Sequence, residues 1–86
     1  MSGRYGNAGD PLAEISTLPE VLDTLRRRLT SIERSSDTLQ VHLASERAHG
    51  VVEALEVLKV LKPADIEALY LAVEDAAQSR ITALLL

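Results

Sequence analysis

A run of apolar residues at alternating steps of four and three is the feature that most constrains this chain. Its members are Leu18, Leu22, Leu25, Leu29, Ile32, Leu39 and Leu43, with Ser36 at the one polar position. Steps of four and three residues keep side chains on one face of an α-helix and form the seam of a coiled coil. The spacing therefore predicts a long amphipathic helix.

Residues 35–37, Ser-Ser-Asp, interrupt this pattern in composition but not in phase. Serine and aspartate favour caps and turns, and Asp37 is suited to cap a new helix with Gln40 at the third position. A turn between two helices would usually reset the apolar phase, so we expect one long helix over about 18–61, bent at this point. A true break at 35–37, giving three helices, is the alternative.

Pro63 marks the boundary to a further helix over 63–85, because proline is tolerated in the first turn of a helix and disfavours helical geometry in the residue before it. Residues 1–16 hold three of the four glycines and no apolar period, which predicts a flexible N-terminal tail. Residues 17–86 then form a single domain. The chain has no Cys, Phe or Trp, and its Ala- and Leu-rich composition predicts an all-α fold.

The helices carry more apolar residues than two helices can bury. Val57 and Val60 lie off the stripe that contains Val51, and Leu71 lies off the main face of 63–85. A surplus of this kind indicates a protein–protein surface. We therefore expect an antiparallel helical hairpin that dimerises into a bundle, with a monomeric three-helix bundle as the alternative.

Four further residues are predicted to belong to this contact surface, namely Arg47, Gly50, Val51 and Arg80. Gly50 lies inside a helical pattern, where glycine costs about 1 kcal/mol relative to alanine, so we expect it to permit a close helix crossing or a local bend. A helix end at Gly50 is the alternative. Arg47 and Arg80 fall within apolar stripes, where a cation needs a partner or must extend to water. Charge pairs across a helix interface are a suitable role for both arginines.

Four side chains form a conditional metal site, namely His42, Glu46, His49 and Glu53. Their spacing places them on one helix face, and imidazole with carboxylate suits zinc or iron. That face lies opposite the apolar stripe, however, so a solvated surface is the favoured interpretation. A metal site would require a subunit contact that buries the face.

Charge and motifs favour a non-enzymatic protein. The formal net charge of the chain is −4. Three consecutive arginines, Arg26, Arg27 and Arg28, fan over about 200° of a helix. They are therefore expected to form surface ion pairs with acids such as Asp23 and Glu33. No nucleophile with triad spacing and no phosphate-binding loop is present.

The sequence thus predicts a cytoplasmic protein–protein interaction module of the adaptor, co-chaperone or inhibitor type. It is expected to self-associate, to need no cofactor and to have no membrane partner. A metal-binding oligomer and a small nucleic-acid-binding regulator are the alternatives, and the acidic balance disfavours the second.

Overall fold

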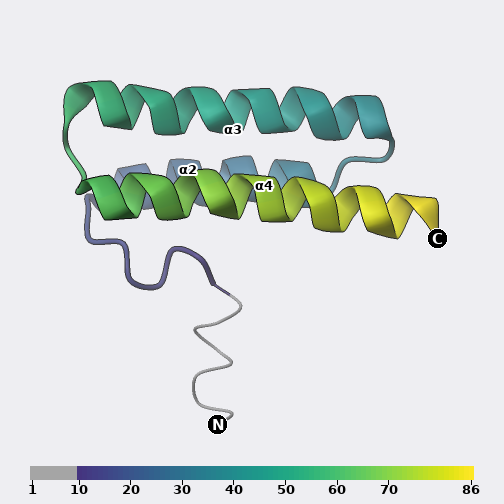
Figure 1. Ribbon diagram of the computed structural model, residues 1–86, viewed down its shortest axis with the longest axis horizontal. Helices are drawn as coiled ribbons and strands as arrows, with labels where there is room; N and C mark the ends of the chain where they lie inside the picture. Colours follow the sequence, from purple (N-terminus) through teal and green to yellow (C-terminus); the bar gives the residue numbers. More distant parts are fainter. Residues whose placement is uncertain (1–9) are drawn as a thin grey trace, which may run out of the picture.

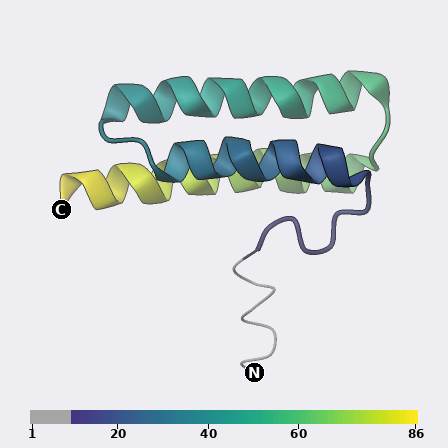
Figure 2. The same cartoon turned by 180° about the vertical axis from the view of Figure 1, so that it is seen from behind.

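Three helices pack around one core in the computed structural model, which describes residues 10–86. They are α2 (Pro19–Glu33), α3 (Thr38–Leu58) and α4 (Pro63–Leu85). α2 and α4 run in the same direction and α3 runs antiparallel to both (Figures 1 and 2). No strand occurs within 10–86, which confirms the all-α prediction.

The long first helix expected over 18–61 is not formed, because the chain breaks at 34–37. Asp37 adopts an extended conformation and its carboxylate accepts a hydrogen bond from the backbone N–H of Gln40 at 2.8 Å. The Gln40 side chain in turn accepts from the N–H of Ser36 at 2.9 Å. These hydrogen bonds cap the start of α3 and favour a new helix there, so the structure has the three helices of the alternative.

Both remaining helix starts use proline. Pro19 and Pro63 occupy the first turns of α2 and α4, where the missing N–H has no partner to lose. α3 ends at Leu58, and the following residue, Lys59, has a left-handed backbone (φ 57°) and donates its N–H to the carbonyls of the last turn. The expected end near residue 61 is therefore three residues too late.

The core forms where the three helices face one another, and its side chains are mostly small and aliphatic. Its helical members are Leu25, Ile32, Val41, Ala44, Ala48, Val52, Leu55, Ile66, Leu69 and Val73. The apolar seam is confirmed along α2 but does not continue into α3, where Leu39 and Leu43 are exposed. Once the chain turns back at 34–37, a different face of α3 meets the core.

The segment 10–16, which was expected to belong to a flexible tail, packs against the helices. Leu12 and Ile15 are buried in the core cluster. Asp10 accepts a hydrogen bond from the N–H of Leu12 at 3.0 Å and pairs with Arg26 at 3.2 Å. The backbone hydrogen bond, followed by Arg26, lowers the pKa of Asp10. Residues 1–9 of the expected tail lie outside the described residues.

Candidate functional site

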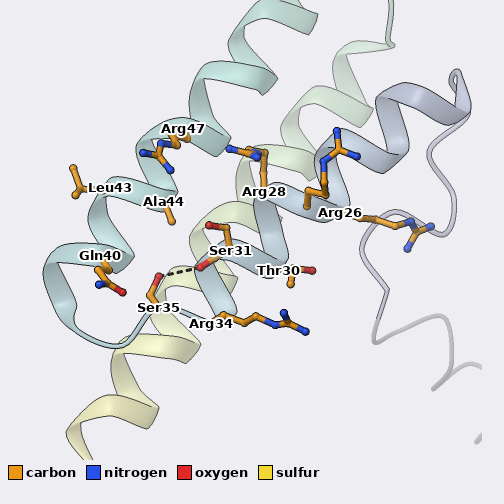
Figure 3. A pocket seen from close by; sticks show the side chains of 11 residues that line it. Arg26, Arg28, Thr30, Ser31, Arg34, Ser35, Gln40, Leu43, Ala44 and Arg47 are labelled. Atoms are coloured by element: carbon orange, nitrogen blue, oxygen red, sulfur yellow. Dashed lines mark hydrogen bonds between the residues drawn. The ribbon is translucent and has the colours of Figure 1, made fainter.

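A groove of about 680 Å³ between α2 and α3 is lined by five of the nine lysine and arginine residues of the chain. We call it the arginine groove. Its lining comprises Arg26, Arg27, Arg28, Thr30, Ser31, Arg34, Ser35, Gln40, Leu43, Ala44 and Arg47. Arg28 extends from α2 toward α3, whereas Arg26 and Arg34 extend away from α3 (Figure 3). No carboxylate lines this groove.

Few of these arginines are neutralised. Within residues 10–86 the structure contains one ion pair, between Arg26 and Asp10. Arg27 donates a hydrogen bond to the hydroxyl of Thr24 at 3.3 Å. The Nε atom of Arg28 is buried and has no hydrogen-bond partner in the described part of the chain. A buried cationic donor of this kind favours the approach of an anion.

The structure adds a shared groove to the sequence interpretation of the arginines and corrects their expected acidic partners. One groove is lined by all three consecutive arginines of α2, Arg26, Arg27 and Arg28, although they fan around the helix. Arg47 on the facing helix α3 completes the basic lining. Neither Asp23 nor Glu33 forms the ion pair with them that was expected. This gathering of charge depends on which face of α3 lies beside α2, and the sequence of α2 alone carries no signal for it.

The outward face of α3 carries an apolar stripe that the core does not use. The outer stripe, as we call it, consists of Leu39, Leu43, Gly50, Ala54 and Val57, which fall within an arc of about 60° around the helix. The exposed fractions of Leu39, Leu43 and Val57 are 67%, 54% and 71%. Isolated exposed leucines are ordinary, but several exposed apolar side chains on one helix face indicate a contact surface.

Gly50 lies in the middle of the outer stripe and no other helix of the chain approaches it. A Cβ atom built at this position would meet nothing within 4 Å. The close helix crossing predicted for Gly50 is therefore absent within the described chain. The space beside Gly50 is open to another molecule.

The four conditional metal ligands do not converge on one another. His42, Glu46 and Glu53 are exposed, as predicted, whereas His49 is half-buried. No group of three or more His, Asp or Glu side chains suited to hold a metal ion occurs in residues 10–86. A site between subunits, the condition attached to these residues, stays a prediction.

His49 instead packs on α4. The rings of His49 and Tyr70 lie with centroids 5.9 Å apart and planes tilted by 43°. The hydroxyl of Tyr70 donates to the Glu56 carboxylate at 2.9 Å, and this hydrogen bond raises the pKa of Tyr70. The polar row of α3 thus contributes contacts between α3 and α4, which spacing within α3 alone does not predict.

The other predicted contact residues fall into two groups. Val57, Val60 and Leu71 are exposed, as their positions off the main stripes predicted, while Val51 packs partly against the core. Arg80 is half-buried, and its Nε donates to the backbone carbonyl of Ser35 at 2.7 Å. Its partner is therefore a carbonyl of the same chain rather than an acid.

Comparison of the chain with protein-family models, with curated protein sequences and with solved structures finds no match. None of the helices in the described part of the chain has both the length and the apolar character needed to cross a bilayer.

Proposed function

We propose that this protein is a non-enzymatic helical interaction module, of the adaptor, co-chaperone or inhibitor type, that self-associates through the outer stripe of α3. The observation that carries the proposal is the exposure of Leu39, Leu43 and Val57 on one face of a helix whose opposite face is already buried. Water contact with this stripe is unfavourable, and association removes it.

The composition of the stripe supports a second copy of the chain as the occupant. An apolar surface is complementary to itself, and a two-fold contact needs only one patch on each subunit. Gly50 and Ala54, one turn apart, have small side chains that permit a close approach of two helices. The free energy that glycine costs inside α3 would be offset by this packing.

Oligomeric mass measured by light scattering across a range of concentrations tests the proposal. We expect the wild-type mass to rise above the 9.3 kDa of one chain. Val57→Glu, which places a charge in the outer stripe, should shift the protein back to a single chain. Leu71→Glu is the matched control, because Leu71 is also exposed but lies on α4.

Two results would contradict the proposal. One is a wild-type mass of a single chain at every concentration. The other is an equal loss of association in Val57→Glu and Leu71→Glu, which would place the contact elsewhere.

A further inference from the structure

We propose that the arginine groove binds an acidic segment of a second protein. This goes beyond self-association, because the groove lies between α2 and α3 and its charged lining residues are all basic, although the groove and the outer stripe meet at Leu43. An adaptor needs two such surfaces, one for its own copy and one for another partner.

The charge distribution of the chain is the first argument. Five of its nine basic residues line the groove, although the net charge of the chain is −4. Asp10 neutralises only Arg26 among them. A carboxylate beside a guanidinium group forms paired, charge-assisted hydrogen bonds, so a basic lining without acids favours an anionic partner.

The position of Arg28 is the second argument. Its Nε is buried without a partner, and its side chain extends from α2 toward α3, the helix that carries Arg47 (Figure 3). The Nε is closed to solvent, so a carboxylate that enters the groove would pair with the terminal nitrogens of the Arg28 guanidinium, whose stem is fixed by this burial. Arg28 and Arg47 are therefore the residues that we assign to the primary contact.

The length and lining of the groove indicate a peptide rather than a small anion. The lining runs along α2 from Arg26 to Arg34, the residue that caps its end, which is about 12 Å by the helical rise and longer than one carboxylate. Leu43 lines the same groove and is more than half exposed, so it offers an apolar contact beside the guanidinium groups. An acidic amphipathic helix matches both features.

Nucleic acid fits the groove less well. Among residues 10–86, the lining contains no aromatic side chain on which a base can stack. The acidic net charge of the chain also opposes the long-range attraction of a polyphosphate.

Fluorescence anisotropy tests the proposal. The probe is a labelled helical peptide of glutamate, leucine and alanine, compared with its glutamine counterpart and with a DNA oligonucleotide of equal net charge. We expect the acidic peptide to bind at low salt and to weaken as salt increases. Arg28→Gln combined with Arg47→Gln should reduce its affinity at least about tenfold, as the loss of charge-assisted hydrogen bonds implies.

Lys62→Gln is the matched control, because it removes one positive charge outside the groove, and it should change the affinity less than about twofold. Since Arg28 is partly buried, Arg47→Gln alone provides a variant on an exposed residue whose fold is checked by circular dichroism. Arg47→Gln alone should also weaken binding more than Lys62→Gln does.

Four outcomes would overturn the proposal: no binding of the acidic peptide, equal binding of its glutamine counterpart, equal losses in the groove variants and Lys62→Gln, or tighter binding of the DNA. The last outcome would assign the groove to nucleic acid. Val57 does not line the groove, so Val57→Glu should leave peptide binding unchanged, and failure of self-association is measured separately from failure of this proposal.

Discussion

Arg80 on α4 donates a hydrogen bond from its Nε to the backbone carbonyl of Ser35 at 2.7 Å. Ser35 follows the end of α2, where the last carbonyls of a helix lack intrahelical partners. The bond joins residues 45 positions apart in the chain and holds α4 against the corner between α2 and α3. A cation is favourable there, because the carbonyl end of a helix carries partial negative charge.

Removal of this contact should destabilise the fold. We expect Arg80→Met, which keeps most of the aliphatic stem, to lower the free energy of unfolding by about 1–2 kcal/mol, since a hydrogen bond from a charged donor is lost. Urea denaturation measures the change. Lys62→Met removes an exposed charge elsewhere and should have a much smaller effect. Equal effects of the two variants would contradict the role assigned to Arg80.

The start of α3 depends on the carboxylate of Asp37. Asp37→Ala should lower the free energy of unfolding by about 1 kcal/mol, because the N–H of Gln40 loses its acceptor. Asp37→Asn keeps an acceptor oxygen and should lie within a few tenths of the wild type. Thermal unfolding followed by circular dichroism tests both. If the alanine and asparagine variants are equally destabilised, the cap does not determine where α3 begins.

Leu12 should contribute to stability although it precedes the first helix described. It is 2% exposed, so Leu12→Ala should lower the free energy of unfolding by about 2–3 kcal/mol through lost burial and the remaining cavity. Leu18→Ala is the matched control, because Leu18 is 65% exposed. Urea denaturation of both variants gives the comparison. A Leu12→Ala protein as stable as the wild type would show that segment 10–16 is not part of the core.

Gly50 should respond in opposite ways to small and large substitutions. Gly50→Ala should raise the free energy of unfolding of dilute protein by about 1 kcal/mol, because the added methyl meets nothing within 4 Å and alanine favours helix. Gly50→Leu should weaken self-association more than His49→Ala does, because a large side chain keeps two α3 helices apart. Unfolding and light scattering measure the two effects. If dilute Gly50→Ala protein has a lower free energy of unfolding than the wild type, the added methyl group is not in open space.

Asp10 should make the free energy of unfolding fall as the pH is lowered into the acid range. Its pKa in the folded protein is lowered from 3.8, so its contribution is present above that value and is lost as the pH falls through the folded pKa. Asp10→Ala should therefore be less stable than wild type at neutral pH, by no more than about 1 kcal/mol for this exposed pair, with the difference closing in acid. Urea denaturation at several pH values checks this.

Asp10→Asn keeps an oxygen that can accept from the N–H of Leu12 but loses the ion pair with Arg26. It should fall between the wild type and Asp10→Ala at neutral pH. A difference between wild type and Asp10→Ala that is constant across pH would contradict the role of the charge.

Local features of the sequence predicted several elements correctly. Proline at 63 predicted the start of α4, and the periodic face of Ile66, Leu69 and Val73 is the face that meets the core. These predictions succeed because helix period and proline geometry act over a few residues. The exposure of Val57, Val60 and Leu71 followed from the same period.

The sequence by itself determined that this chain is helical, which face of α2 and α4 is apolar, and that apolar side chains remain for the outside. Only the tertiary structure decided that the chain turns back at residues 34–37, so that Leu39 and Leu43 face outward and Arg28 and Arg47 line one groove. The physical reason is that the helix period fixes the apolar face only within one helix, whereas packing against the other two helices decides which face of α3 is buried after the turn. The burial of Val41, Ala44 and Ala48 against two other helices, with the cap at Asp37, favours the turn over one long helix.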